Sequence, residues 1–276
     1  MAKEPDVPLE RAAGSGLDAS AWPEAIRRIR ARTPARIFAG PVAATYLTST
    51  QLELREAHAA ARDAVRTQMS LEKIFPAAFL AEWKIFEVPT RAATKDEFLL
   101  RPDLGRHFAE ASRAEIRARC PVNAQLQIAI GDGLSVTAVA AQVPALLPQL
   151  MTGARARGWT VGQPYFIRHC RVGILNEIGE LLSPDVAVLL IGERSGLATA
   201  ESLSAYMAYR PAASHTDANR NLISNIHARG VPASPVSPSG GPPDAATRIL
   251  ALAAQMMRAR LSGCTLREEF RQLEAT

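Results

Sequence analysis

The pattern of apolar and polar positions changes character near residue 125. Before this point, apolar residues recur at helical spacing between charged ones. After it, three stretches that predict strands, at residues 126–130, 164–172 and 185–191, are separated by helical patterns at 135–158 and 175–182, and the last of the three is almost continuously apolar. Continuous apolar runs are typical of parallel strands buried on both faces, and their alternation with helices is typical of βαβ units. The sequence therefore predicts an α/β fold with a parallel sheet flanked by helices, preceded by a mainly helical N-terminal region.

Local signals predict elements in the N-terminal region. Pro23 suits the first turn of a helix over residues 23–32, which precedes a short extended piece at 35–40. Thr50 and Glu53 form a capping box for a helix that runs to about residue 68. The aromatic residues of 70–88 are expected to form a packed connection in the core or at a subunit contact. Residues 91–106 are expected to form an ordered turn, in which Asp103 is available to cap a helix that ends near residue 119.

Three further elements follow the last apolar run. Residues 201–209 alternate as in a strand with two different faces. Prolines and glycines over 229–243 indicate a flexible surface loop. Asp244 then caps a final helix that Gly263 ends. Residues 1–20 are polar and are expected to be mobile.

Composition narrows the class of protein. The 276 residues are 47% hydrophobic and 21% charged, as in ordinary globular proteins. No apolar run approaches the ~20 residues that span a bilayer, and the N-terminus lacks the apolar core of a secretory signal. The three cysteines, Cys120, Cys170 and Cys264, are widely spaced and indicate reduced thiols. We therefore expect a cytoplasmic protein with no membrane partner.

The net charge of +5 raises nucleic-acid binding as an alternative. Arginines cluster only at residues 27–32 and are otherwise dispersed among acids. Solvated helix faces are the favoured explanation, and a basic cluster facing an acidic partner subunit is the second. We therefore expect no nucleic-acid partner.

Two turns that follow predicted strands are candidate ligand sites. Glu193 lies between glycines directly after the 185–191 strand, and ligands of open α/β sheets bind outside the carboxyl ends of the strands. Gly131, Asp132 and Gly133 follow the first strand, but the third glycine of a dinucleotide fingerprint is missing. Asp132 either accepts a hydrogen bond from a ligand or caps the following helix, and the sequence does not decide between these.

No catalytic set is evident in the sequence. Ser135, His169 and Asp132 could be assembled as a triad, but no nucleophile-elbow pattern surrounds Ser135. His58 lies within a predicted helix with no second candidate nearby. The chain therefore combines a ligand-binding α/β part with no catalytic machinery of its own, which suits the non-catalytic subunit of a cofactor enzyme.

Five stretches, in this order, together carry a family resemblance: residues 94–106, 131–135, 192–197, 201–206 and 216–226. With them, the chain resembles the small (light) subunit of adenosylcobalamin-dependent ethanolamine ammonia-lyase from about residue 22 to the C-terminal helix. Each stretch alone is a weak signal, whereas five in the family's order are highly specific.

The resemblance implies a Rossmann-like, cobalamin-binding domain over residues 106–276 that covers one side of adenosylcobalamin. Residues 21–105 would form the helical region that contacts another subunit. It also implies a hetero-oligomer with a large subunit, a TIM barrel, which binds ethanolamine and the adenosyl group. The enzyme would convert ethanolamine to acetaldehyde and ammonia by radical chemistry that belongs to the cofactor. Whether residues 1–20 address the protein to a bacterial microcompartment is left open.

The resemblance places the corrin-contacting positions on Val172, Glu193 and Leu222, with no catalytic or metal-binding residue in this chain. Glu193 would accept hydrogen bonds from the amide side chains of the corrin or its tail, and Val172 would contact it through backbone or apolar surface. Ser195 stands where the family usually has Pro, and Leu222 stands where some members have Cys. A stand-alone Rossmann-type nucleotide-dependent oxidoreductase is the alternative function.

Overall fold

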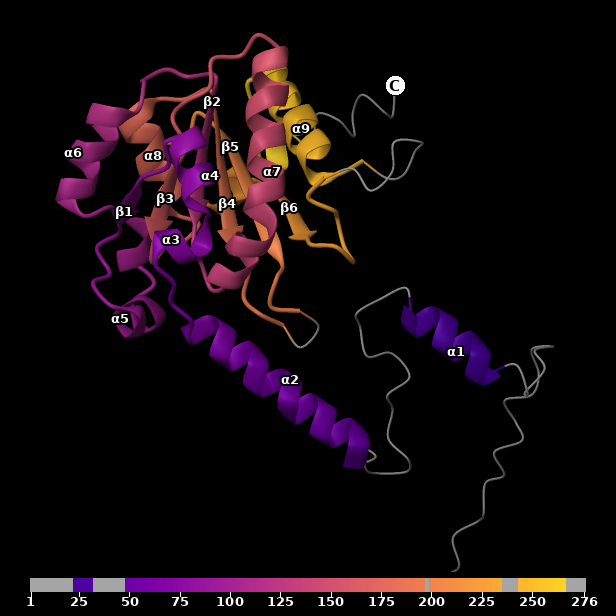
Figure 1. The fold of residues 1–276 in the computed structure, drawn as a ribbon. Coiled ribbons are helices and arrows are strands. Elements are labelled where there is room, and N and C mark those ends of the chain that lie inside the picture. Colours follow the sequence, from indigo (N-terminus) through magenta and orange to yellow (C-terminus); the bar gives the residue numbers. More distant parts are fainter. Residues whose placement is uncertain (1–21, 32–47, 197–198, 235–242, 267–276) are drawn as a thin grey trace, which may run out of the picture. The chain divides into compact units, whose positions relative to one another are not determined.

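The computed structural model describes residues 22–31, 48–196, 199–234 and 243–266 (Figure 1). The chain divides into two compact units, Met1–Glu53 and Leu54–Thr276. The predicted domain boundaries at residues 20 and 105 stay a prediction. The segments predicted at 1–20 and 35–40, and most of the loop predicted at 229–243, lie outside the described residues.

The second unit is built on one sheet of six strands, in the order β1-β3-β2-β4-β5-β6. The strands are β1 (Glu87–Pro89), β2 (Leu126–Gly131), β3 (Tyr165–Arg168), β4 (Val186–Gly192), β5 (Leu203–Tyr209) and β6 (Asn221–Ile226). Strands β1, β3, β2 and β4 run parallel, whereas β5 pairs antiparallel with both β4 and β6. The structure is thus a mixed α/β fold.

The expectation of a parallel sheet is therefore right for four strands and wrong for β5 and β6. The chain passes through the helix α7 between β2 and β3 and through α8 between β3 and β4. Each helix returns the chain to the same end of the sheet, so the next strand can run in the same direction. Only residues 193–202 join β4 to β5, and a parallel crossover takes about a dozen residues or more. The chain therefore returns beside β4 in the opposite direction.

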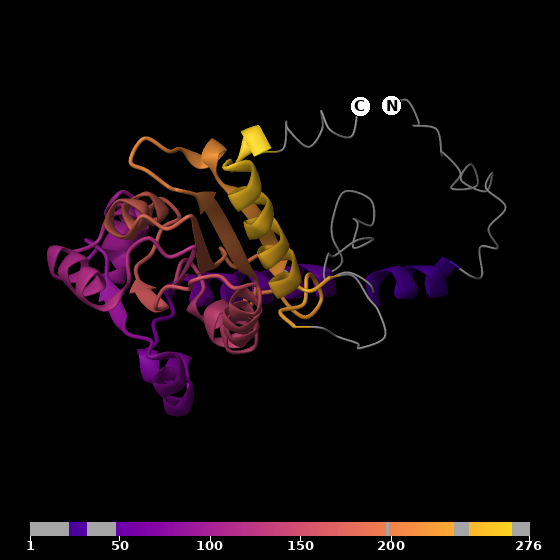
Figure 2. The same cartoon turned by 90° about the horizontal axis from the view of Figure 1, so that it is seen from above.

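The helices in chain order are α1 (Trp22–Ala31), α2 (Thr48–Arg66), α3 (Leu71–Ile74), α4 (Ala77–Trp83), α5 (Lys95–Leu100), α6 (Glu110–Arg119), α7 (Val136–Ala156), α8 (Ile174–Leu182) and α9 (Ala245–Ala259), with short 3-10 turns η3 (Leu104–Arg106) and η4 (Asp217–Asn219). Helices α7 and α9 pack on one face of the sheet, and α6 and α8 lie on the other. Figure 2 shows the yellow α9 along one side of the strands. No helix of the described ranges combines the length and apolar character needed to cross a membrane.

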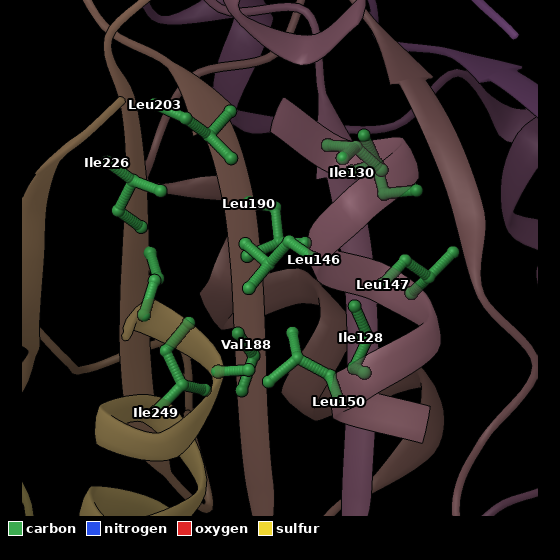
Figure 3. Close-up of a cluster of buried hydrophobic side chains, with 14 of the residues drawn as sticks. Ile128, Ile130, Leu146, Leu147, Leu150, Val188, Leu190, Leu203, Ile226 and Ile249 are labelled. Carbon is green, nitrogen blue, oxygen red and sulfur yellow. The ribbon is translucent and has the colours of Figure 1, made fainter. Parts of the chain in front are cut away.

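Two buried clusters lie on the two faces of the sheet. Figure 3 shows the cluster under α7 and α9, in which Ile128 and Val188 of the strands meet Leu147 of α7. Ala129 and Leu189, the next residues of the same strands, belong to the cluster on the α8 side. Successive strand residues point to opposite faces, so a strand covered on both faces must be apolar throughout. This requirement explains the continuous apolar runs of β2 and β4.

The aromatic stretch at 70–88 forms core, as predicted. Phe75 is buried in the α7 cluster and Phe86 in the α8 cluster. The stretch also contains β1, a strand that the sequence did not reveal because it is only three residues long. It pairs with β3 and so joins the sheet.

Helix ends were predicted with mixed success. Asp244 caps α9 as predicted, since its Oδ1 accepts from the Thr247 N–H at 2.9 Å. Thr50 is not an N-cap, because α2 already begins at Thr48. Asp103 does not cap α6, which begins at Glu110; its carboxylate pairs with Arg101 at 2.8 Å instead.

The segment predicted as an ordered turn contains the helix α5. Its N-cap is Thr94, whose hydroxyl accepts from the Glu97 N–H at 3.1 Å. The helix is only six residues long, and Pro102 follows it closely, so its periodicity is too short to read from sequence.

Candidate functional site

The three predicted contact residues lie on different elements of the sheet. Val172 follows β3 and precedes α8, and Glu193 directly follows β4. Because β3 and β4 are parallel, both residues lie beyond the carboxyl ends of strands, where α/β folds bind ligands. Leu222 lies within the edge strand β6, so its position depends on the antiparallel part of the sheet.

Tyr206 of β5 lies near two of these three residues. Leu222 lies directly opposite Tyr206 in the β5–β6 ladder, so both side chains point to the same face. Val172 and Tyr206 pack against the same buried cluster on the α8 side. Burial, together with the negative charge of Glu193, raises the pKa of the Tyr206 hydroxyl. Leu222 and Glu193 therefore lie near Tyr206, whereas Val172 shares with it only the buried cluster on the α8 side.

Sequence reasoning did not single out Tyr206 as a site residue. Two signals could have identified it. It ends the motif at residues 201–206, and strand alternation places it on the same face as Ser202 and Ser204.

The carboxylate of Glu193 is held by three donors, one directly before β5, one within β5 and one within β6. Its Oε2 accepts from the Ser202 hydroxyl at 2.6 Å, and its Oε1 accepts from the Ser204 hydroxyl and, at 3.1 Å, from the Asn225 N–H. The Glu193 N–H itself donates to the Ser202 carbonyl at 3.0 Å. A carboxylate offers about four acceptor positions, so this half-buried group retains about one for a ligand.

The face around Tyr206 is open where it reaches β6. Leu222 is 39% exposed, whereas Ile226 on the opposite face is fully buried. A large apolar side chain on an edge strand whose Asn225 N–H also holds the Glu193 carboxylate makes a surface with both apolar and polar groups. Such a surface suits a ligand with an apolar body and amide or hydroxyl substituents.

The structure excludes the Ser135–His169–Asp132 triad. Ser135 is the N-cap of α7, accepting from the Ala138 N–H at 3.2 Å and donating to the Ala200 carbonyl. The Nδ1 of His169 lies 2.9 Å from the Ala92 carbonyl. Each side chain is therefore bound to backbone groups, and none is linked to another as a nucleophile and base would be.

Asp132 fills neither of the two roles considered from sequence. It is buried, and its two oxygens accept from the backbone N–H groups of His169 at 2.9 Å and Cys170 at 2.8 Å. It therefore fastens the end of β2 to the turn after β3, the turn that ends in Val172. Ser135 caps the helix in its place.

The glycine turn after β2 is closed to a phosphate. Gly133 has a φ of +58°, and a Cβ there would collide with the Gly192 carbonyl. The carbonyl of Gly133 accepts from the buried Lys95 ammonium at 3.3 Å. Burial lowers the pKa of Lys95, and the carboxylate of Asp132 opposes that shift. Since this turn packs against its own chain, it does not favour the nucleotide-dependent oxidoreductase.

The cysteines are free thiols, as predicted. Burial raises the pKa of Cys120 to about 12 and that of Cys170 well above its usual range. Both thiols therefore stay protonated at neutral pH, a state that suits packing and not nucleophilic attack.

A family model and three similar proteins all point to the same protein family. A model of the family described as "Ethanolamine ammonia-lyase light chain (EutC)" matches residues 23–267. Three similar proteins are each named "Ethanolamine ammonia-lyase small subunit". The one from Clostridium perfringens is 42% identical over 79% of this chain and 72% of its own length. Those from Fusobacterium nucleatum and Listeria monocytogenes are 40% and 38% identical, over 76% and 88% of this chain and 69% and 78% of their own lengths.

Proposed function

The chain belongs to the ethanolamine ammonia-lyase light chain family, and from this premise we propose that it binds adenosylcobalamin together with a large subunit. In this assembly the cofactor supplies the radical chemistry that converts ethanolamine to acetaldehyde and ammonia. This chain supplies one wall of the cofactor site, and the large subunit, a TIM barrel, binds the ethanolamine. The enzyme is a hetero-oligomer of the cytoplasm.

The residues around Tyr206 fit a corrin. A corrin ring is a broad macrocycle with an apolar body and a fringe of amide side chains. Leu222 offers an exposed apolar contact on the same face as the half-buried Tyr206 ring. Glu193 offers a carboxylate oxygen whose direction is fixed by Ser202 and Ser204. Apolar contact and amide recognition are thus available side by side.

Each of these residues has a defined part in the proposal. The carboxylate of Glu193 accepts a hydrogen bond from an amide of the cofactor and orients the ring. Val172 and Leu222 exclude water from its apolar surface. None of the three moves a proton or touches the reacting carbon atoms, since the substrate lies on the partner subunit. The parallel strands with helices on both faces support describing this part of the chain as Rossmann-like.

The placement of Glu193 and Leu222 beside Tyr206 carries the proposal, and substitution of Glu193 tests it. The chain is co-expressed with its large subunit, and cobalamin affinity is measured by equilibrium dialysis. Losing a hydrogen bond to a charged group costs about 1.5–3 kcal/mol, so Glu193→Ala is expected to weaken binding by about tenfold or more.

Glu82→Ala is the matched control, because Glu82 is exposed on α4 in another part of the unit. It is expected to leave cobalamin affinity unchanged. An affinity that stays the same in both variants would rule out Glu193 as a cofactor contact. A complex that binds no cobalamin with either wild-type or variant chain would refute the proposed function itself.

A further inference from the structure

A cavity of about 570 Å³ lies directly beside Val172. Its lining comes from three separate parts of the chain: the turn around η3, the start of α8, and the segment from Ala213 to Arg220. The residues that matter here are Arg106, Arg171, Val172, Asn176, His215 and Arg220. Two of the five family-like stretches, 94–106 and 216–226, meet in this cavity, which we call the arginine cavity. The contacts described so far assign no role to it.

Arg220 is the most firmly placed of the three arginines. Its side chain is only 6% exposed. Its Nη2 donates to the side-chain oxygen of Asn176, Oδ1, at 2.8 Å, and its Nη1 forms an ion pair with the carboxylate of Asp217. Asn176 is itself fixed, because its amide donates to the His215 carbonyl at 2.7 Å. The guanidinium is therefore held in one orientation.

Buried nitrogen atoms of three cavity-lining residues lack hydrogen-bond partners among the described residues. Within the part of the chain that the structure describes, the Nε atoms of Arg220 and Arg171 and the Nδ1 of His215 are buried without a hydrogen-bond partner. Leaving a charged group's donor unsatisfied costs more than leaving a neutral one. The residues that carry these atoms line the same cavity, so this part of the chain holds hydrogen-bonding capacity that the described residues do not use.

Arg171 and Arg106 lie close together without a carboxylate partner among the described residues. The Nη2 of Arg171 donates to the Phe98 carbonyl at 3.1 Å, and its guanidinium lies 4.2 Å over the Phe98 ring. Burial lowers the pKa of Arg171, and the positive charge of Arg106 lowers it further. Two neighbouring positive charges of this kind are stabilised by an anion placed between them.

The acids around the cavity do not serve as that anion. Glu177 accepts from Arg113 and, at 2.7 Å, from the Phe108 N–H. Glu180 is exposed, and the side chain of Asp217 is 94% exposed while it pairs with a terminal nitrogen of Arg220. The negative charge of Asp132 opposes the lowering of the Arg171 pKa, but both oxygens of Asp132 accept from backbone N–H groups. Neither Arg171 nor Arg106 therefore forms an ion pair with a carboxylate among the described residues.

We propose that the arginine cavity binds a phosphate group, and that in the assembled enzyme this phosphate belongs to the nucleotide tail of the cobalamin. Planar guanidinium groups match phosphate oxygens in pairs of hydrogen bonds, and several arginines around one site are typical of phosphate recognition. The inference rests on the proposed cofactor-binding function, since Val172 is both a proposed corrin contact and a wall of the cavity.

The test compares three ligands that differ in the tail: cobinamide, which has none, cobinamide phosphate, and cobalamin. Affinities for the complex with the large subunit are measured by equilibrium dialysis, without reference to catalytic activity. The wild-type complex is expected to bind cobinamide phosphate at least about tenfold more tightly than cobinamide, because charge-assisted hydrogen bonds are gained. Arg220→Gln is expected to abolish this preference and leave cobinamide affinity within about twofold.

Because Arg220 is buried, Arg220→Gln could lower binding by disturbing the fold. A second variant at an exposed residue of the cavity separates the two causes. Arg106→Gln alters an exposed residue and is expected to reduce the same preference severalfold while the melting temperature stays unchanged. Arg117→Gln is the matched control, since Arg117 is an exposed arginine of α6 outside the cavity. It should bind all three ligands as the wild type does.

Four other results would each overturn a different statement. If the variants lower the affinities for cobinamide and cobinamide phosphate by the same factor, the cavity does not bind the phosphate, and the proposed function stands. If the wild type shows no preference but binds inorganic phosphate through Arg220, the site serves a free phosphate and not the tail. If no ligand binds wild type, the proposed function is refuted. If Arg117→Gln loses the preference as well, the effect is one of overall charge, and the cavity is not the site.

Discussion

Strands β4 and β6 belong to the same sheet, yet every residue of β4 is buried, whereas the middle of β6 is partly exposed. The difference follows from what covers each strand. Helix α7 packs on one face of β4 and α8 on the other, whereas β6 is covered by α9 on one face only. The doubly covered strands form the buried centre of the sheet, whereas β6 keeps one face that the helices of the described residues do not cover.

One row of side chains crosses both regions. Leu189 of β4 lies opposite Tyr206 of β5, which lies opposite Leu222 of β6. The side chain of Leu189 is fully buried, whereas that of Leu222, at the other end of the row, is 39% exposed. The same residue type on the same face therefore serves stability at one end and, as we propose, binding at the other.

The largest expected effect comes from the two leucines of this row. Leu189→Ala removes a buried side chain and leaves a cavity, so it is expected to lower the free energy of unfolding by about 2–5 kcal/mol. Leu222→Ala is expected to change it by less than about 0.5 kcal/mol. Urea unfolding measured by circular dichroism distinguishes the two. Equal losses at both positions would contradict the division of the sheet into a structural and a binding region.

Asp132 and Glu193 follow strands β2 and β4, and their substitution separates structural from binding carboxylates. Asp132→Ala leaves the buried N–H groups of His169 and Cys170 without an acceptor, which is expected to cost about 2–4 kcal/mol of unfolding free energy. Asp132→Asn keeps one acceptor oxygen and should fall between Ala and the wild type. The measurement is again chemical unfolding.

Glu193→Ala is expected to lower cobalamin affinity strongly. It is expected to lower the free energy of unfolding less than Asp132→Ala does. Its partners are mostly hydroxyl groups at the end of the sheet, where the carboxylate is half-buried. If Glu193→Ala were as destabilising as Asp132→Ala, the carboxylate of Glu193 would be a structural group like that of Asp132.

The smallest expected effect is a pH dependence at the end of β6. Burial, followed by the charge of Arg229, lowers the pKa of His227 from its ordinary value of 6.5. In the pH range just below 6.5 the unfolded chain binds more protons than the folded one, so stability falls as pH decreases. His227→Asn is expected to reduce this slope in unfolding curves recorded between about pH 5 and pH 7.

His58→Asn provides the control, because His58 is exposed on α2. Its slope should match that of the wild type. A His227→Asn variant with an unchanged slope would show that this histidine does not titrate differently in the folded and unfolded states.

The doubly covered part of the sheet could be predicted from sequence almost completely. The runs that form β2, β3 and β4 and the helical patterns of α7 and α8 lie where they were predicted, within a few residues. Burial on both faces leaves no polar positions in a strand, so the signal is strong in the sequence. Asp244 was equally predictable, because an N-cap bonds to a residue only three positions away.

The antiparallel part was harder to predict for a physical reason. Strand β6 carries Asn221 and Asn225, and its exposed face tolerates polar residues, so its pattern does not stand out from a loop. The direction of β5 depends on the length of its connection to β4, and not on its composition. The sequence signals that mark Tyr206 do not show what surrounds it, because Leu222 and Glu193 reach it from β6 and from the end of β4.

The sequence by itself determined the family resemblance, the α/β class and the identity of the strands buried on both faces. These depend on local spacing and on short-range hydrogen bonds. Only the tertiary structure decided that Asp132 fastens one strand end to another, that Glu193 and Leu222 lie near Tyr206, and that three arginines from distant segments surround one cavity. Such groupings follow from the order and direction of the strands, which bring together residues that the chain itself keeps far apart.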